Sequence, residues 1–216
     1  MRIAAEGTPF IKTGLALEAG LLVLCWAWPG FLTAFVAALG VPFVIWLLIF
    51  FRDPERTGPR GEALVISPAY GRVCSIARVD EPVYLHQQAT RISVFMNVFD
   101  VHVNRYPASG EVEIVHYTPG EFLNAAREDA ALVNESSSVG IRTPRGLMLV
   151  KQVAGLVARR IVTDANPGDQ ATQGERMGMI RFGSRVDVFL GPGWAVKVAL
   201  GDRVLAGTTV LAEPGA

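Results

Sequence analysis

Hydrophobic and polar positions divide the chain into an apolar first quarter and a longer remainder of ordinary charge. No Asp, Glu, Lys or Arg occurs in residues 19–51, and Pro29-Gly30 interrupts this stretch once. The segment after the interruption, Phe31–Phe51, has about the ~20 apolar residues that a helix needs to cross a bilayer. The segment before it, Thr13–Trp28, is shorter and contains one glutamate. The pattern predicts a helical hairpin that turns at Pro29-Gly30.

Basic residues flank this hairpin on both sides. They are Arg2 and Lys12 before it, and Arg52, Arg56 and Arg60 after it. If positive charges stay in the cytoplasm, both ends of the hairpin lie there. A signal peptide is disfavoured, because the apolar region is too long and no small-residue cleavage site follows it. We expect residues 1–56 to span or dip into the cell membrane from its cytoplasmic face. The alternative is a core hairpin of a soluble protein, which so long an uncharged run disfavours.

The remainder of the chain has the pattern of a β-rich domain. Short segments rich in β-branched residues alternate with Gly and Pro. These segments are Val65–Pro68, Gly71–Ile76, Arg91–Met96, Glu111–Val115, Leu147–Ala158, Ala195–Val198 and Gly201–Ala212. The best helical candidate is Glu121–Val133, whose apolar residues recur at near-helical spacing. The sequence predicts an α+β protein, with the hairpin in residues 1–56 and a β-rich domain in residues 57–216.

The last two of these segments resemble the hammerhead strands of lipoyl and biotinyl carrier domains. A carrier needs a lysine at the tip of its hairpin, and none stands there. We therefore expect lipoyl-like strands at the C-terminal end without a carrier function.

Composition narrows the classes of function. Twenty basic and twenty acidic residues give a formal net charge of zero, which disfavours a nucleic-acid binder that acts through a basic field. The two cysteines, Cys25 and Cys74, cannot form a disulfide framework, and Cys25 lies in the apolar stretch, so a zinc site is unsupported. Only three of the basic residues are lysines, which leaves few candidates for a catalytic lysine.

One of the three histidines lies in an unusually polar segment. His102 belongs to Phe99–Arg105, which follows an apolar strand. If the segment is a strand, Asp100, His102 and Asn104 share one face. Polar groups in such a place are costly unless they face a site. A lone histidine is more often structural, so the segment alone leaves both interpretations open.

A second candidate is the dipeptide Gly183-Ser184. A glycine before a serine leaves room for the hydroxyl to approach the preceding carbonyl. Gly-Ser is also among the commonest turn dipeptides, so alone it decides nothing.

Taken together and in order, these motifs resemble the phosphatidylserine decarboxylase proenzymes of the short bacterial type. The resemblance covers nearly the whole chain. Its motifs are Phe50–Arg56, Arg91–Phe99, His102–Arg105, Gln152–Ile161, Gly174–Arg176 and Ile180–Arg185, followed by the glycine-rich tail.

The resemblance implies a precursor that cleaves itself. Ser184 would attack the carbonyl of Gly183, the peptide bond would become an ester, and elimination would leave a covalent pyruvoyl group in place of Ser184. The products would be a β chain of residues 1–183 and an α chain of residues 184–216, held together as a heterodimer or a higher oligomer. The pyruvoyl ketone would condense with the substrate amine and accept electrons as CO2 leaves. The family needs neither a metal nor pyridoxal phosphate.

The resemblance also implies a substrate and roles for particular residues. The substrate would be phosphatidylserine in the membrane, and the product phosphatidylethanolamine. His102 would be the base for Ser184 and could later protonate the substrate carbanion. Arginines near the site could hold the lipid phosphate or the substrate carboxylate. The candidates are Arg105, Arg159, Arg181 and Arg185.

Two positions depart from the family pattern. The segment that usually reads Ser-Pro-Ala-Asp-Gly has Tyr70 in place of the aspartate thought to orient the histidine, and Ser136 follows Asn134-Glu135 where an arginine is usual. A tyrosine cannot stabilise an imidazolium as a carboxylate does, so either Asp100 or another acid compensates or maturation is slow. The alternatives are a maturation-impaired member, a non-catalytic scaffold, or a decarboxylase of a related serine-headgroup lipid of the archaetidylserine type.

Overall fold

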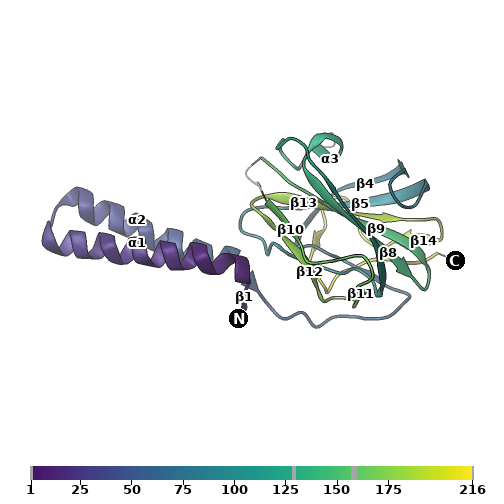
Figure 1. Cartoon of the computed structure of the whole chain (residues 1–216), viewed down its shortest axis with the longest axis horizontal. Coiled ribbons are helices and arrows are strands. Elements are labelled where there is room, and N and C mark those ends of the chain that lie inside the picture. Colours follow the sequence, from purple (N-terminus) through teal and green to yellow (C-terminus); the bar gives the residue numbers. More distant parts are fainter. Residues whose placement is uncertain (1, 128–129, 157–159, 216) are drawn as a thin grey trace. The chain divides into compact units, whose positions relative to one another are not determined.

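The computed structural model describes residues 2–127, 130–156 and 160–215. The chain divides into two compact units, residues 1–55 and 56–216. The first unit consists mainly of two helices and the second mainly of strands (Figure 1). The predicted α+β class, with a helical hairpin before a strand-rich domain, is confirmed.

The first unit is a helical hairpin that turns where the sequence indicated. After a short 3-10 helix (η1, Ala5–Gly7), helix α1 spans Thr8–Ala27 and helix α2 spans Phe31–Phe50. Proline in the first turn of α1 is compatible with a helix start, because no backbone N–H is needed there. In the turn, the hydroxyl of Thr33 lies 2.9 Å from the carbonyl oxygen of Gly30 and 3.1 Å from that of Trp28, and donates to them. Thr33 thereby gives the carbonyl group of Trp28, at the end of α1, a hydrogen-bond donor.

Small residues allow the two helices to pack closely. A Cβ added to Gly14 would lie 2.9 Å from a methyl group of Leu47, and one added to Gly40 would overlap the carboxyl of Glu18. At the base of the hairpin, strand β1 (Arg2–Ile3) pairs with β2 (Arg52–Asp53). The hairpin is therefore closed at its base by a short antiparallel ladder.

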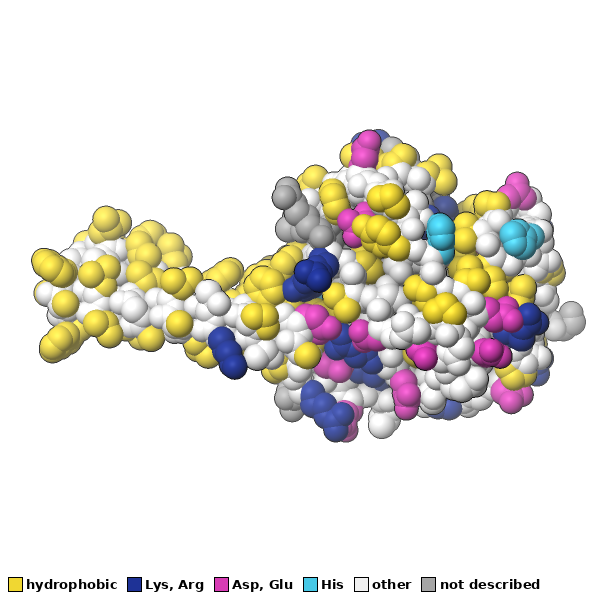
Figure 2. Space-filling view, in the orientation of Figure 1, with side chains coloured by type: hydrophobic (Ala, Val, Ile, Leu, Met, Phe, Trp, Pro, Cys, Tyr) yellow, Lys and Arg dark blue, Asp and Glu magenta, His cyan; other side chains and the backbone are white. Residues whose placement is uncertain are grey.

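Most of the large apolar side chains of the hairpin are exposed. Trp26 is 85% exposed and Phe31 is 87% exposed, and hydrophobic side chains cover both helices in Figure 2. By length and composition, both helices could cross a membrane. This exposed apolar surface suggests membrane association.

The second unit is built from antiparallel sheets. Its strands are β3 (Val65–Ile66), β4 (Gly71–Glu81), β5 (Gln87–Met96), β6 (Val103–Arg105), β7 (Gly110–Thr118), β8 (Ser136–Thr143), β9 (Gly146–Val153), β10 (Arg160–Thr163), β11 (Gln170–Ala171), β12 (Arg176–Arg181), β13 (Ser184–Leu190), β14 (Trp194–Val196), β15 (Arg203–Val204) and β16 (Val210–Pro214). Within the described residues, the eight-stranded sheet has the order β11-β7-β8-β9-β13-β5-β4-β15. Two three-stranded sheets, β10-β12-β6 and β14-β16-β3, accompany it.

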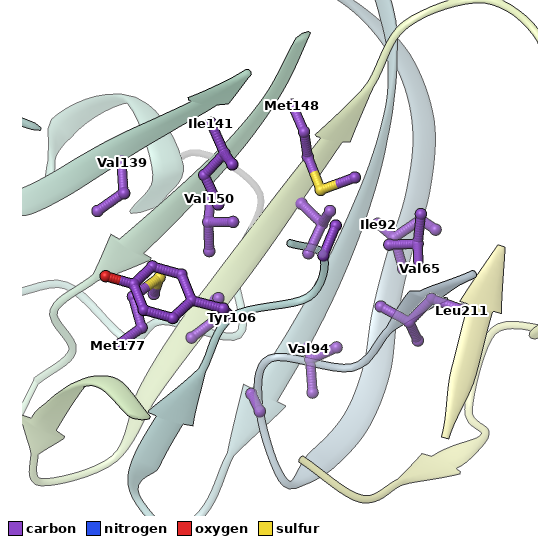
Figure 3. Packing of buried hydrophobic residues seen from close by; sticks show 14 of the residues in the cluster. Val65, Ile92, Val94, Tyr106, Val139, Ile141, Met148, Val150, Met177 and Leu211 are labelled. Atoms are coloured by element: carbon purple, nitrogen blue, oxygen red, sulfur yellow. The ribbon is translucent and has the colours of Figure 1, made fainter. Parts of the chain in front are cut away.

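Strand β13 lies in the middle of the large sheet, and its two faces differ. Val186, Val188 and Leu190 belong to the main hydrophobic core. Ile92 and Val150 from the neighbouring strands lie in the same core (Figure 3). Alternation along the strand sends the odd-numbered residues to the opposite face. One face of β13 is therefore packed in the hydrophobic core, and the other face carries the buried charged residues Arg185 and Asp187.

The C-terminal segment is an integral part of this domain. Strand β13 pairs with β5 and β9, β15 pairs with β4, and β16 pairs with β3. Side chains of residues 184–216 also supply part of the buried core. The prediction that the tail pairs as strands with the rest of the domain is confirmed.

Two expected elements differ in the structure. The helix expected over residues 121–133 is confined to α3 (Ala130–Val133), residues 122–127 form turns and irregular chain, and residues 128 and 129 lie outside the described part. The strand expected over residues 147–158 ends at Val153, and its last two residues also lie outside that part.

Candidate active site

Two turns that connect the same pair of sheets lie against each other. Strand β5 leads through residues 97–102 to β6, and β12 leads through Phe182-Gly183 to β13. Because β13 pairs with β5 and β12 pairs with β6, both connections pass between the two sheets at one place. The topology therefore brings His102 and Ser184 together, although they are far apart in the sequence.

Gly183 occupies a backbone conformation that favours glycine. Its φ is +58°, in the left-handed region, and the Arg181–Phe182 peptide bond just before it is cis. A side chain at position 183 would be strained in this region. The turn thus accounts for the glycine that precedes Ser184.

Ser184 has a buried hydroxyl with no hydrogen-bond partner among the described residues. The residue is 0% exposed, and its Cα pairs with that of Met96 across the sheet. An unpaired buried hydroxyl costs about 1–3 kcal/mol, so such a group calls for a functional explanation. Here the hydroxyl belongs to the residue that the sequence singled out as the nucleophile.

The imidazole of His102 connects the two turns. It is fully buried, with Nδ1 3.0 Å from the carbonyl oxygen of Asp100. The backbone N–H of Gly183 donates to Nε2 at 3.2 Å. Since a carbonyl can only accept, Nδ1 carries the proton and Nε2 carries the lone pair. The basic nitrogen of His102 therefore faces the Gly183–Ser184 pair.

The expectation that Asp100, His102 and Asn104 share one strand face is wrong. Only residues 103–105 are strand, and Asp100 ends a turn in which its N–H donates to the carbonyl oxygen of Asn97. Its carboxylate accepts from the N–H of Asn97 at 2.9 Å and from Arg203 at 2.8 Å. In this local turn, which the alternation pattern ignores, the carboxylate of Asp100 binds the N–H of Asn97 and the guanidinium of Arg203.

Tyr70 and Asp100 meet at Arg203. The guanidinium of Arg203 lies 5.1 Å from the centre of the Tyr70 ring and donates to its hydroxyl at 3.2 Å. That of Arg56 lies 5.7 Å from the same ring. Tyr70, at the position of the family aspartate, thus contacts the arginine that is paired with Asp100.

The candidate arginines occupy different places. Arg105 donates to the carbonyl oxygen of Gly174 at 3.0 Å, Arg181 ends β12, and Arg159 lies outside the described residues. Arg185 is wholly buried on the face of β13 opposite the main core, and it forms an ion pair with Asp187. The described residues contain no group of three or more His, Cys, Asp or Glu side chains that could hold a metal ion.

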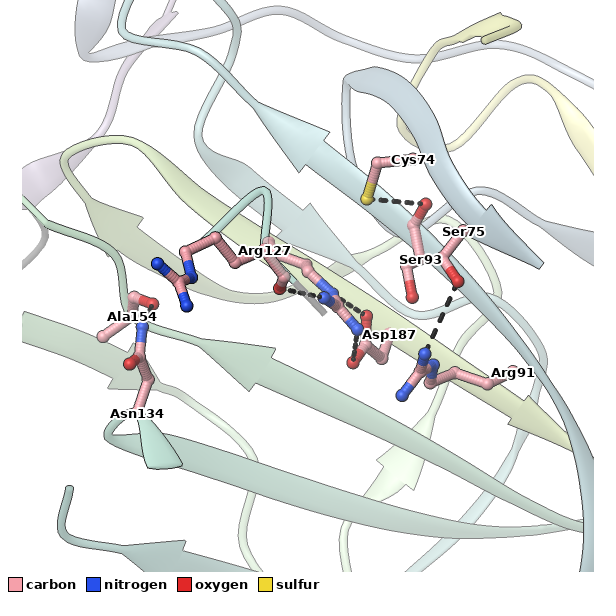
Figure 4. Close-up of polar contacts among 9 residues, drawn as sticks. Cys74, Ser75, Arg91, Ser93, Arg127, Asn134, Ala154 and Asp187 are labelled. Atoms are coloured by element: carbon pink, nitrogen blue, oxygen red, sulfur yellow. Dashed lines mark hydrogen bonds and ion pairs between the residues drawn. The ribbon is translucent and has the colours of Figure 1, made fainter. Parts of the chain in front are cut away.

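The ion pair of β13 belongs to a group of polar side chains on the face of the large sheet opposite the main core, and Figure 4 shows Asp187 and Arg91 among them. Lys151 on β9 lies opposite Asp187, and Arg91 on β5 contacts Ser75 at 3.4 Å. Burial lowers the pKa of Lys151, and the charge of Asp187 partly offsets this. This polar group, formed by Arg91, Lys151, Arg185 and Asp187, is separate from the candidate site, but its first β13 residue, Arg185, follows Ser184 directly.

Sequence reasoning missed Gly155 as part of the site. Its α-carbon lies against the carbonyl group of Gly183, so that an added Cβ would overlap the carbonyl oxygen. The only signal in the sequence is a glycine soon after a buried strand, within a motif that the family resemblance already included. The contact between positions 155 and 183 is non-local and becomes visible only in the fold.

Comparisons with known proteins agree with this geometry. The family model of phosphatidylserine decarboxylase matches residues 43–212. A phosphatidylserine decarboxylase proenzyme of Nitrosomonas eutropha is 48% identical over an alignment of 200 residues, and the match covers 86% of this chain and 92% of that protein. Both matches include the Gly183–Ser184 turn and, with it, most of the β-rich domain. The chain therefore belongs to the phosphatidylserine decarboxylase family and is a decarboxylase.

Proposed function

We propose that this protein converts phosphatidylserine to phosphatidylethanolamine with a pyruvoyl group made by self-cleavage between Gly183 and Ser184. The observation that carries the proposal is the buried hydroxyl of Ser184, which has no hydrogen-bond partner in the described part of the chain and follows a glycine whose N–H donates to His102. The named substrate of the similar proenzyme from Nitrosomonas eutropha supports the choice of lipid.

The first step is an N-to-O acyl shift within the chain. The Oγ of Ser184 forms a bond to the carbonyl carbon of Gly183, and the peptide C–N bond breaks. Nε2 of His102 accepts the hydroxyl proton and returns it to the leaving nitrogen of Ser184. For this, Nε2 must exchange the N–H of Gly183 for the hydroxyl of Ser184.

Elimination completes the cleavage. The α-proton of residue 184 is lost, its Cβ–Oγ bond breaks, and Gly183 leaves as a carboxylate. The dehydroalanine that remains takes up one water and releases ammonia, which leaves a pyruvoyl group at residue 184. Atoms balance with one water consumed and one ammonia released.

The surroundings of residue 184 fit such a group. Ser184 is fully buried, residues 182–184 carry no charged side chain, and the Ser184 oxygen has no hydrogen-bond partner among the residues that the structure describes. When present, the pyruvoyl group supplies the electron sink for loss of CO2 from the substrate. His102 is then placed to hold a proton at Nε2 for delivery to the substrate carbon.

Residues 1–183 and 184–216 form the β and α chains and stay together as a heterodimer. The hairpin attaches the enzyme to the cytoplasmic face of the membrane, where the substrate lies. The basic residues on both flanks of the hairpin support this orientation.

The test compares the wild-type protein with Ser184→Ala. Intact masses under denaturing conditions should show two chains for the wild type and one for the variant. Only the wild type should release CO2 from phosphatidylserine in mixed micelles. A wild-type protein that stays uncleaved, or a cleaved Ser184→Ala, would refute the proposal. If the wild type is cleaved but releases no CO2 from this lipid, the proposed self-cleavage stands and the proposed substrate is refuted.

A further inference from the structure

The carbonyl group of Gly183 contacts the backbone of Gly155 so closely that no side chain fits at position 155. A Cβ added to Gly155 would overlap the carbonyl oxygen of Gly183 and would lie 3.2 Å from its carbonyl carbon. On another side, the added atom would lie 3.2 Å from the Cβ of Ala125. The φ of Gly155 lies outside the left-handed region, so glycine is needed here for space and not for backbone conformation.

The side chain of Asn134 holds the backbone that forms this surface. Asn134 is 2% exposed, and its Nδ2 donates to the carbonyl oxygen of Ala154 at 2.8 Å (Figure 4). The same amide donates to the carbonyl oxygen of Leu123 and accepts from its N–H, at 2.8 and 2.9 Å. The N–H of Ala154 donates to the carbonyl oxygen of Glu135 at 2.9 Å. The residue before Gly155 is thus fixed by hydrogen bonds at both its N–H and its carbonyl.

The other side of the scissile bond is held through Arg185. Its guanidinium donates to the two carboxylate oxygens of Asp187 at 2.6 and 2.9 Å. A further N–H donates to the backbone carbonyl oxygen of Arg127 at 3.0 Å (Figure 4). Bidentate pairs of this kind have a fixed geometry, so they orient the strand as well as neutralising the charge. The residue that follows Ser184 is therefore tied to the chain near residue 127.

Both attachments come from the same part of the chain, residues 121–127 and 130–135. Asn134 acts on the Gly183 side through Ala154 and Gly155, and the carbonyl of Arg127 acts on the Ser184 side through Arg185. We propose that Gly155, Asn134 and Arg185 are positioning residues that hold the scissile peptide bond for attack by Ser184, with the backbone of Leu123 and the carbonyl group of Arg127 as their supports. This inference rests on the proposed self-cleavage at Gly183–Ser184.

The physical basis is the geometry that the acyl shift requires. The hydroxyl oxygen must approach the carbonyl carbon of the preceding residue from a narrow range of directions. A displacement of about 1 Å can slow such a reaction about 100-fold. Moving the Gly183 carbonyl away from Gly155, or releasing Ala154, should therefore slow the acyl shift and leave later chemistry unaffected.

The test follows self-cleavage in freshly synthesised full-length protein after a translation pulse. Gly155→Ala forces the carbonyl to move, and Asn134→Ala removes the hydrogen bonds that hold Ala154. We expect each to slow the appearance of the two chains by about 100-fold. Matched controls make the same substitutions at positions where few contacts are gained or lost. Gly215→Ala has its nearest atom at 3.5 Å, and Asn124→Ala removes a local hydrogen bond on the exposed part of the same segment. Both controls should cleave at the wild-type rate.

A second readout separates positioning from general damage. Hydroxylamine cleaves an ester at residue 184 but not a peptide bond. The uncleaved Gly155→Ala and Asn134→Ala precursors should therefore resist hydroxylamine, because they stop before the ester forms. Chains that do cleave should release CO2 at the wild-type rate for each pyruvoyl group, which is counted by labelling the ketone with a hydrazine.

Several results would overturn the inference. They are cleavage at the control rate in either variant, a precursor sensitive to hydroxylamine, or slow cleavage that simply follows a loss of near-ultraviolet circular dichroism. Ser184→Ala is run in parallel. If it is cleaved, or if the wild type is not, the proposed self-cleavage itself fails, which is a different outcome from a failure of positioning.

Discussion

At the scale of single residues, the orientation of His102 depends on a main-chain oxygen. The carbonyl of Asp100 fixes Nδ1, while the carboxylate of the same residue is engaged by Arg203 and the N–H of Asn97. An asparagine at position 100 would keep the carbonyl and an acceptor for Asn97. The carboxylate and the imidazole can therefore be tested separately.

We expect His102→Ala and Asp100→Asn to behave very differently. His102→Ala removes the base and should slow self-cleavage by about 10²–10⁴-fold. Asp100→Asn should slow it by less than about tenfold, because it mainly weakens an ion pair with the half-exposed Arg203. The measurement is the cleavage half-time from intact masses after a translation pulse.

The exposed His116 supplies the control, since His116→Ala makes the same change away from the site. A strong block in Asp100→Asn would show that the carboxylate serves the imidazole after all. In that case Tyr70→Asp, which adds a carboxylate beside Arg203, should accelerate maturation. If the backbone carbonyl of Asp100 orients the imidazole, Tyr70→Asp should leave the rate of self-cleavage nearly unchanged.

At the scale of elements, the sequence pattern predicted the helices and strands that local interactions determine. The hairpin turn at Pro29-Gly30 and the main strands follow from uncharged length, alternation and the positions of Gly and Pro. The expected helix over residues 121–133 failed because long-range bonds compete with it. The amide of Asn134 binds both backbone groups of Leu123, and the N–H of Glu121 donates to the carbonyl oxygen of Val133. These contacts close a loop in place of helical hydrogen bonds.

The site could be predicted from the sequence only in part, for the same reason. Ser184, Gly183 and His102 were proposed from short motifs and a family resemblance, and their roles stay predictions. The contact of Gly155 with Gly183 joins two turns that are distant in the sequence, and no local pattern encodes it. The shared strand face of Asp100, His102 and Asn104 was wrong because strand alternation was assumed where the chain makes a turn.

The polar group on the large sheet leads to a prediction about stability. Burial lowers the pKa of Lys151 from 10.5, with Asp187 partly opposing the shift and Arg185 adding to it. The unfolded chain then binds this proton more tightly than the folded chain, so the stability contributed by position 151 rises as the pH rises toward 10.5. Lys151→Met removes the penalty and should raise the melting temperature at pH 7. The gain should shrink as the pH approaches 10.5.

The measurement is thermal unfolding of Ser184→Ala with and without Lys151→Met, from pH 7 to 10. The uncleaved background keeps one chain in both samples, and other titrating groups cancel in the difference. A difference that grows with pH, or a variant less stable at pH 7, would contradict the pKa direction. It would mean that Lys151 mainly neutralises Asp187.

At the scale of the whole molecule, the first prediction concerns the side of the membrane. Both ends of the hairpin carry basic residues, and no acidic or basic residue interrupts positions 19–51. From the positive-inside tendency we expect residues 56–216 to lie in the cytoplasm. Protease added to intact spheroplasts should leave this domain whole, and permeabilised spheroplasts should lose it. Digestion in intact spheroplasts would place the domain outside.

The last prediction concerns what holds the two chains together after cleavage. Residues 184–216 are too few to bury a core alone, and they supply the central strand of the large sheet. Strand β13 pairs with β5 from Ser184 to Leu190 and with β9 on its other side. Its release would expose two sheet edges and remove Val186, Val188 and Leu190 from the core. Its release would also break the hydrogen bond from Arg185 to the backbone carbonyl oxygen of Arg127 in the other chain.

We therefore expect the β and α chains to elute as one species in gel filtration, even after strong dilution. Native mass spectrometry should give the sum of the two chains, and denaturing conditions should give each chain alone. Denaturant should release the α chain only in the transition that also unfolds the β chain, because each chain completes the core of the other. Loss of the α chain from a β chain that stays folded would show that the sheet does not depend on β13.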